Sequence, residues 1–289
     1  MRRLTIILGP TAVGKTDYSI LEALRAGSPV ISCDSRQIFR DMTIGTAVPE
    51  KEQLERVPHH FIQTLPVTAS YTAGMYEMDA LALIRRLFGE GHEELVMTGG
   101  SMFYIDAVCR GIDDIPAAPP SLRAELTRRI REEGVGALAE ELRHLDPETC
   151  EEIDIANPQR VVRALEVCLA TGQPFSSFKK RADKRREFEI VKVGLERPRE
   201  ELYARIDARV DRMMEAGLLE EVRRLSPLRD CPALRTVGYT ELFDYLDGKT
   251  SVEEAVRLIK RNTRHYAKRQ LTWWRRDTDI LWKTTWQGK

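Results

Sequence analysis

A glycine-rich loop between an apolar run and an amphipathic segment constrains this chain more than any other feature. The loop reads GPTAVGKT, follows the apolar residues 4–8, and precedes residues 17–26, whose spacing predicts a helix. This is the P-loop pattern in its strand–loop–helix context, where successive backbone N–H groups converge on one anion. The residues expected to hold a polyphosphate are Gly9, Pro10, Thr11, Ala12, Val13, Gly14, Lys15 and Thr16.

Two side chains of this loop have predicted roles of their own. Lys15 would place a mobile positive charge on the outer phosphates, and the Thr16 hydroxyl would bind Mg²⁺, the expected cofactor. Loops of this kind commonly bind ATP. The pattern alone leaves open whether the phosphates are an energy source or a leaving group.

A carboxylate follows the next predicted strand. Residues 29–33 are predicted to form a strand that leads into Asp34, within the sequence DSRQ, whereas the later strand at residues 94–98 leads into Gly99-Gly100-Ser101. In open α/β folds ligands bind at the carboxyl ends of parallel strands, so Asp34 is a candidate reactive group. A helix N-cap or a carboxylate near the magnesium ion would explain it equally well at this point.

The middle of the chain differs from both ends. A proline-rich hinge at residues 115–120 precedes segments of helical periodicity at residues 122–132, 135–145 and from 157 onward, and a strand pattern returns at residues 188–194. We therefore predict an α/β fold: a P-loop NTPase-like core with a parallel sheet, formed by residues 1–114 and 181–289. Residues 115–180 would be a helical insertion.

Composition excludes several classes. The formal net charge of the 289 residues is +0, and the five cysteines are scattered without a CxxC pair. Neither a disulfide framework nor a zinc site is indicated, which favours a reducing compartment. No apolar run reaches the roughly 18 residues of a membrane span, so we expect a cytoplasmic protein.

His59 and His60 are adjacent, but we favour a structural role because no further ligand lies at metal-binding spacing.

The predicted last helix, residues 252–276, mixes basic and aromatic side chains. Two interpretations are open: a surface for single-stranded RNA, with phosphate pairing and base stacking, or a solvated face backed by core tryptophans. The basic candidates for RNA contact on this helix are Lys268 and Arg269.

Nine short segments, in order along nearly the whole chain, resemble the tRNA dimethylallyltransferase family. They are GPTAVGKT at 9–16, DSRQIF at 34–39, IGTA at 44–47, PHH at 58–60, TGGSMFY at 98–104, NPQRVVRALEV at 157–167, LYARIDARVDRM at 202–213, TVGYTEL at 236–242 and AKRQLTWWR at 267–275. The resemblance implies transfer of a dimethylallyl group from dimethylallyl diphosphate to the exocyclic amine of the adenosine 3′ of the anticodon, so the loop would hold a diphosphate leaving group.

The resemblance also implies roles for three catalytic residues. Asp34 matches the aspartate that would act as general base on the adenine amine. Thr11 would contact the diphosphate, and Arg209, the second arginine of an R-I-x-x-R pattern, would add positive charge. A surface salt bridge is the alternative for Arg209.

The expected partners are the tRNA anticodon stem-loop and dimethylallyl diphosphate, with no membrane. The candidate tRNA-binding residues, taken from the resemblance and from the basic last helix, are Asp34, Ser35, Arg36, Gln37, Ser101, Arg123, Gln159, Arg160, Val161, Val162, Arg163, Arg235, Gly238, Tyr239, Lys268 and Arg269. Three positions depart from the family pattern: Ser101 stands where threonine is usual, and Val48 and Thr240 replace basic residues.

Two other functions fit part of the sequence. A small-molecule or nucleotide kinase would share the P-loop and the α/β core. A non-catalytic tRNA-binding module would explain the basic last helix but neither Asp34 nor the P-loop. We expect a monomer, because no apolar helix stripe is left without a partner.

Overall fold

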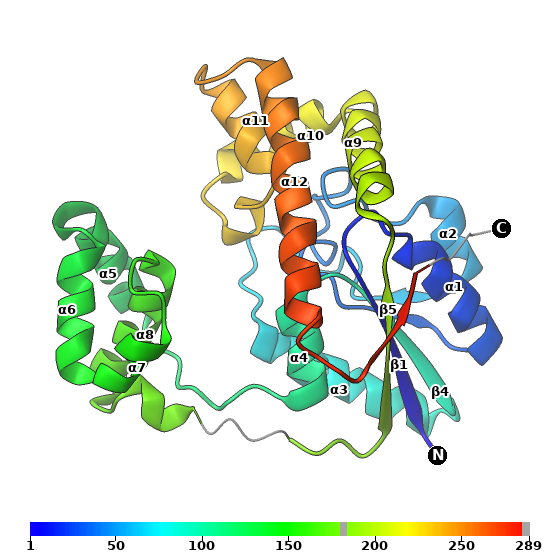
Figure 1. The fold of residues 1–289 in the computed structure, drawn as a ribbon, viewed down its shortest axis with the longest axis horizontal. Helices are drawn as coiled ribbons and strands as arrows, with labels where there is room; N and C mark the ends of the chain where they lie inside the picture. The colour runs from blue at the N-terminus through cyan, green and yellow to red at the C-terminus, as the bar shows by residue number, and fades with distance from the viewer. Residues whose placement is uncertain (180–183, 285–289) are drawn as a thin grey trace. The chain divides into compact units, whose positions relative to one another are not determined.

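The computed structural model describes residues 1–179 and 184–284, which form two compact units. One unit comprises Met1–Cys109 and Arg185–Lys289, and the other comprises Arg110–Lys184. The first is called the core unit here and the second the helical unit (Figure 1). The predicted insertion at residues 115–180 falls within the helical unit, and the predicted return to the core at residue 181 lies outside the described residues.

A six-stranded parallel sheet is the centre of the core unit, which confirms the predicted fold class. The strand order is β3-β2-β4-β1-β5-β6. The strands are β1 (Arg3–Leu8), β2 (Val30–Ser32), β3 (His59–His60), β4 (Glu94–Thr98), β5 (Glu189–Leu195) and β6 (Ile280–Lys283). Four of them match the predicted strands, whereas β3 and β6 were not predicted, because they are short and lie at the two edges of the sheet.

Side chains that alternate along β1 pack on both faces of the sheet. Leu4, Ile6 and Leu8 join a core with α3 (Ala73–Gly89) and α4 (Met102–Arg110). Ile7 faces the other side and joins a core with α1 (Lys15–Ala26) and α9 (Arg199–Glu215). A strand buried on both faces is typical of a parallel sheet between helical layers.

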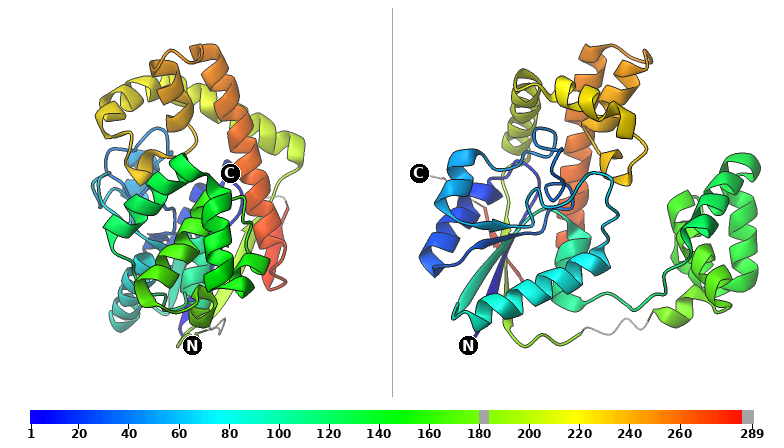
Figure 2. Two further views of the ribbon diagram at one scale, coloured as in Figure 1. Left: turned by 90° about the vertical axis from the view of Figure 1, so that its left-hand side faces the viewer. Right: turned by 180° about the vertical axis from the view of Figure 1, so that it is seen from behind.

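A separate apolar core lies among the later helices of the core unit. It joins α10 (Leu218–Leu225), α11 (Tyr239–Leu246) and the first half of α12 (Val252–Trp274) to a loop around Ile38 and Met42. In Figure 1, and from behind in Figure 2, α10, α11 and the upper part of α12, yellow to orange, lie above the sheet and next to α9. The short helix α2 (Lys51–Arg56) follows the same loop.

The helical unit has its own apolar core. Its helices are α5 (Pro120–Glu133), α6 (Val135–Leu145), α7 (Pro147–Glu152) and α8 (Pro158–Thr171). Leu138, Leu142, Val161 and Leu165 are fully buried where these helices meet. The predicted helices at residues 122–132, 135–145 and from 157 are therefore confirmed.

His59 forms part of β3, and its Nδ1 lies 2.7 Å from the carbonyl oxygen of Val57. Burial lowers the pKa of both His59 and His60, which favours the neutral imidazoles. Within residues 1–179 and 184–284, no helix has the length and apolar content to cross a membrane.

The loops after β1, β2 and β4 begin at the same edge of the sheet. Gly9 follows β1, Cys33 follows β2 and Gly99 follows β4, and the Cys33 N–H donates to the Thr98 carbonyl at 2.7 Å. Parallel pairing therefore brings three chemically distinct loops together, as the sequence predicts for Asp34.

Gly99 permits the close approach of two of these loops. A Cβ at position 99 would lie 2.6 Å from the Cys33 carbonyl carbon and oxygen, which are backbone atoms that cannot rotate away. We predict that Gly99→Ala lowers the free energy of unfolding by about 1–3 kcal/mol, the usual effect of overpacking a core. The measurement is the denaturant midpoint at unchanged m-value.

Gly89→Ala is the matched control, because an added Cβ there meets nothing within 4 Å. We expect its unfolding midpoint to equal or exceed that of the wild type. Equal midpoints for the two alanine variants would contradict the contact at Gly99.

Candidate functional site

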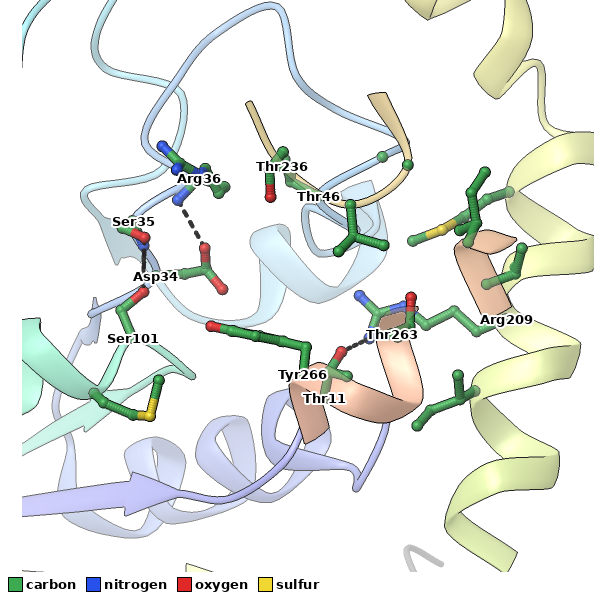
Figure 3. A pocket seen from close by; sticks show the side chains of 18 of the residues that line it. Thr11, Asp34, Ser35, Arg36, Thr46, Ser101, Arg209, Thr236, Thr263 and Tyr266 are labelled. Atoms are coloured by element: carbon green, nitrogen blue, oxygen red, sulfur yellow. Dashed lines mark hydrogen bonds between the residues drawn. The ribbon is translucent and has the colours of Figure 1, made fainter. Parts of the chain in front are cut away.

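One cavity of about 530 Å³ opens at the carboxyl edge of the core unit's sheet (Figure 3). Its polar side carries Thr11, Asp34, Ser35, Arg36, Ser101, Arg209 and Tyr266, and its apolar side carries Ile206, Val210, Met213, Leu218, Val237 and Ile259. The structure thus brings together the three predicted catalytic residues, Asp34 among them, and four further predicted RNA contacts: Ser35, Arg36, Ser101 and Gly238. All lining residues belong to the core unit.

The P-loop curls around the end of the Lys15 side chain. The Nζ donates to the carbonyls of Gly9 and Pro10, each at 2.9 Å. Burial and, next, the charge of Arg209 lower the pKa of Lys15 to about 8. Two cations held close together form a site that favours a polyanion.

Arginines contact three successive residues of the loop. Arg197 donates to the Val13 carbonyl and Arg205 to the Ala12 carbonyl, each at 2.9 Å, and Arg209 donates to the Thr11 hydroxyl at 3.2 Å. Only Arg209 was predicted, although Arg205 is the first arginine of the same R-I-x-x-R pattern and lies one helical turn away. The interaction with Thr11, drawn in Figure 3, places Arg209 in the cavity and replaces the surface salt bridge alternative.

Ala12 adopts a φ of 64°, an uncommon conformation for a residue with a side chain. The Arg205 hydrogen bond to its carbonyl helps to hold it there. The loop is therefore shaped by the helix α9 as well as by its own glycines.

Asp34 begins a tight turn at the end of β2. Its Oδ1 accepts from the backbone N–H of Arg36 at 2.8 Å and of Gln37 at 3.3 Å. In Figure 3 the other carboxylate oxygen points away from this turn, toward Tyr266 and Arg209. One oxygen thus fixes the orientation of the carboxylate, and the other faces the cavity. Burial lowers the pKa of Arg209, and the negative charge of Asp34 acts against this larger effect to raise it.

Ser101 links the turn to the loop after β4. Its hydroxyl accepts from the Ser35 N–H at 2.8 Å and donates to the Ser35 hydroxyl at 2.9 Å. The departure from threonine in the family pattern thus keeps the hydroxyl that makes both bonds.

Gln270, which is 1% exposed, connects the same region to the P-loop. Its side-chain oxygen accepts from the Thr11 N–H at 2.9 Å, and its nitrogen donates to the Gly100 carbonyl at 2.8 Å. This residue of α12 holds the phosphate loop and the Ser101 loop at a defined separation. Sequence reasoning did not single it out.

Tyr266 is one of the aromatic side chains of the predicted last helix. It lines the cavity, and its hydroxyl donates to the Gly100 carbonyl at 3.3 Å. A helical stripe was the available signal: Ile259, Thr263, Tyr266 and Gln270 recur at spacings of four, three and four residues and share one face of α12.

Some basic side chains of α12 are paired with acids, whereas Lys268 and Arg269 are exposed. Arg264 binds Asp207 at 2.5 Å, and Lys260 binds Asp211 at 2.6 Å. Trp274 is 1% exposed and belongs to the core. Over these positions the helix matches the solvated face backed by a core tryptophan better than an open RNA surface.

The remaining predicted RNA residues of the core unit lie in different environments. Gln37 donates through its side chain to the carbonyls of Thr46 and Ala47. Arg235, Lys268 and Arg269 are exposed, and Lys268 lines a second hollow with Arg197, Arg199 and Arg275, apart from the residues of the main cavity. Gly238 lines the cavity, whereas Tyr239 is fully buried.

In the helical unit, the predicted residues divide between surface and core. Gln159 and Arg160 are exposed at the start of α8. Arg123 and Arg163 both bind the buried carboxylate of Glu166, at 2.7 Å in each case.

Val161 and Val162 are buried within the helical unit. The RNA contacts predicted for Val161, Val162 and Tyr239 therefore cannot come from their side chains as placed here, because each side chain packs inside a core. The RNA contacts predicted for the exposed residues stay predictions.

The lowered pKa of Lys15 generates a testable pH dependence. The amine loses its proton as the pH rises through about 8, and the neutral form no longer attracts a phosphate. We predict that the affinity for inorganic pyrophosphate, measured by calorimetry with magnesium, falls by up to about tenfold per pH unit above this value. Lys15→Arg, charged throughout, should lack this component, and parallel curves for the two proteins would contradict it.

Comparisons with known proteins identify the family of this chain. A tRNA dimethylallyltransferase 2 of Porphyromonas gingivalis is 54% identical over 279 residues, which covers 96% of this chain and 93% of the relative. A tRNA dimethylallyltransferase 1 of Phocaeicola vulgatus is 50% identical over 279 residues, with the same two shares.

Solved structures give the same result. The crystal structure of the full-length tRNA isopentenylpyrophosphate transferase from Bacillus halodurans has a TM-score of 0.71 at 38% identity, and the match covers 98% of this chain and 90% of that one. A eukaryotic dimethylallyltransferase acting on tRNA has a TM-score of 0.82 at 24% identity over 98% of this chain and 74% of that one, which supports the fold alone.

The family model described as IPP transferase matches residues 37–277. This span includes the Asp34-turn residue Gln37 and ends just after α12. The chain belongs to the IPP transferase family.

Proposed function

We propose that this protein is a tRNA dimethylallyltransferase, which transfers the dimethylallyl group of dimethylallyl diphosphate to the N6 amine of the adenosine 3′ of the anticodon. One observation carries the proposal: a single cavity is lined both by Asp34 and by Thr11 and Arg209 on its phosphate side. A proton acceptor and an anion cradle thus face the same space, as alkyl transfer from a diphosphate requires.

The reaction needs a base on one side and charge neutralisation on the other. The adenine nitrogen attacks the allylic carbon, the bond from that carbon to the diphosphate oxygen breaks, and the N6 proton passes to Asp34. Lys15, Arg209 and the P-loop N–H groups stabilise the negative charge that grows on the departing diphosphate. The apolar side of the cavity, with Val210 and Met213, suits the prenyl group.

The target base has to leave the anticodon-loop stack to reach Asp34. Arg36, Ser35 and Ser101 line the cavity beside this carboxylate and are the nearest candidates to hold the base. Exposed Gln159 and Arg160 on α8 of the helical unit, and Arg235, Lys268 and Arg269 of the core unit, are proposed contacts to the rest of the RNA. Val48 and Thr240 contribute no charge to it.

Thr16 is the residue proposed to bind Mg²⁺. It lies in the first turn of α1 next to Lys15, and its oxygen is a hard donor of the kind this ion prefers. Within the described residues no group of three or more acidic, histidine or cysteine side chains forms a metal site, so the diphosphate and water would supply the other ligands. The ion would add positive charge beside the leaving group.

We further propose a cytoplasmic monomer in which the P-loop accepts dimethylallyl diphosphate in place of ATP. All five cysteines are free thiols, as expected in a reducing compartment. Gel filtration with light scattering tests the oligomeric state.

A kinase is the alternative function, and the family assignment does not favour it. The deciding experiment incubates the protein with tRNA, magnesium and dimethylallyl diphosphate, followed by nucleoside mass spectrometry for a prenylated adenosine. A parallel incubation supplies ATP and candidate acceptors. Phosphoryl transfer without prenylation would reverse the order of the two functions.

Asp34→Asn tests the base. The amide oxygen still accepts from the N–H groups of Arg36 and Gln37, so the turn is retained, but the side chain no longer takes up a proton. We expect kcat to fall by about 10²–10⁴-fold, the usual contribution of general base catalysis, while the Kd for tRNA stays close to that of the wild type.

Asp41→Asn, an exposed residue on the following loop, is the matched control and should retain the wild-type kcat. Ordinary turnover by Asp34→Asn would exclude the proposed base.

A further inference from the structure

A buried carboxylate organises one wall of the cavity from behind. Glu221, in α10, is 3% exposed. Its Oε2 accepts from the backbone N–H of Thr43 at 3.0 Å and of Ile44 at 2.8 Å, and its Oε1 accepts from that of Gly45 at 3.0 Å. Three consecutive amides therefore converge on one carboxylate, in the way that loop amides usually converge on a bound anion.

A tyrosine from a third segment joins this cluster. The hydroxyl of Tyr239, at the start of α11, donates to Glu221 Oε1 at 2.7 Å, and the residue is fully buried. Its ring lies against Gly45, where an added Cβ would be 2.6 Å from the ring carbon Cε2. The loop, α10 and α11 are thus connected through two side chains that were not predicted to cooperate.

The loop held in this way reaches the reactive groups. Gly45 and Thr46 line the cavity, and in Figure 3 Thr46 lies between Arg36 and Arg209. The side chain of Gln37 donates to the carbonyls of Thr46 and Ala47 at 3.2 and 2.8 Å. Gln37 also belongs to the Asp34 turn, so the loop is linked to the candidate base through a single residue.

The position of Tyr239 is itself well determined. The preceding Gly238 N–H donates to the buried carboxylate of Glu241 at 2.8 Å, and Asn262 of α12 donates to the same carboxylate at 2.7 Å. Val237 and Gly238 line the cavity directly before Tyr239. Loop 43–46 and segment 236–238 are therefore two parts of one wall, joined behind it by Glu221 and Tyr239.

We infer that Glu221 and Tyr239 are positioning residues for group transfer, which hold the cavity wall formed by loop 43–46 and segment 236–238. They act through loop 43–46 and touch neither substrate. This inference rests on the proposed function, since the transferred group is the one that the wall confines. It also assigns Tyr239 a role from inside the core, in place of the predicted contact with RNA.

The test compares two conservative variants. Glu221→Gln replaces one acceptor oxygen with a donor nitrogen that faces either an N–H group or the tyrosine hydroxyl, and Tyr239→Phe removes a single hydroxyl. We expect kcat for prenyl transfer to fall about tenfold or more in Glu221→Gln and about fivefold in Tyr239→Phe, because small displacements near reacting groups cost rate steeply. The Kd for tRNA should stay within about twofold of the wild type, since the RNA-facing residues remain in place.

Hydrogen exchange supplies a readout independent of activity. In the wild type the amides of Thr43, Ile44 and Gly45 are bonded to Glu221, so their exchange should be faster in Glu221→Gln, with little change in the amides of α1. Glu220→Gln, an exposed neighbour paired with Arg223, and Tyr245→Phe are the matched controls and should behave as the wild type.

Several results would overturn the inference. They are wild-type kcat in both variants, an equal loss of tRNA affinity and kcat, or unchanged exchange at residues 43–45 in Glu221→Gln. If Glu221→Gln does not fold, Tyr239→Phe alone tests the inference. Its kcat should then fall while its Kd for tRNA stays within about twofold of the wild type. Absence of prenylated adenosine with the wild-type protein would instead reject the proposed function, and the inference with it.

Discussion

The parallel pairing of β1 with both β4 and β5 is the constraint on which the rest of the core unit depends. The pairing aligns Ile7 with Thr98 on one side and with Val193 on the other. The chain segments that follow these strands therefore begin at the same edge of the sheet. Because the phosphate loop, the Ser101 loop and the approach to α9 all begin there, their functional groups meet without any long connection.

Contacts between distant segments then set the distances within the cavity. Gln270 spans the phosphate loop and Gly100, and Glu221 fixes the loop at residues 43–46. Each of these side chains is buried and has its polar atoms paired, so it contributes order at little cost. A rigid frame of this kind suits group transfer to a weak nucleophile, because holding the reacting groups in the right orientation lowers the activation barrier.

Local pattern was sufficient to predict the phosphate loop and Asp34, because a strand, a glycine turn and a helix follow one another in sequence. The same reasoning could not predict Gln270 or Glu221. Their backbone partners lie 170 or more residues away, and a lone glutamine or glutamate on a helix looks like any surface residue until the fold is known. Charge patterning within α12 could not reveal that Lys260 and Arg264 pair with acids of α9. The helical spacing of Ile259, Thr263, Tyr266 and Gln270 on one face of α12 would have identified Tyr266, whereas a count of charges did not.

The helical unit leaves the core and returns to it at adjacent points, since the Lys184 N–H donates to the Arg110 carbonyl at 2.7 Å. An insertion whose ends already meet adds almost no closure entropy to the domain that carries it. Such a module can be shortened, enlarged or exchanged during evolution while the sheet keeps its register. A chimaera that grafts a foreign hairpin between these two residues would thus inherit an undisturbed catalytic half.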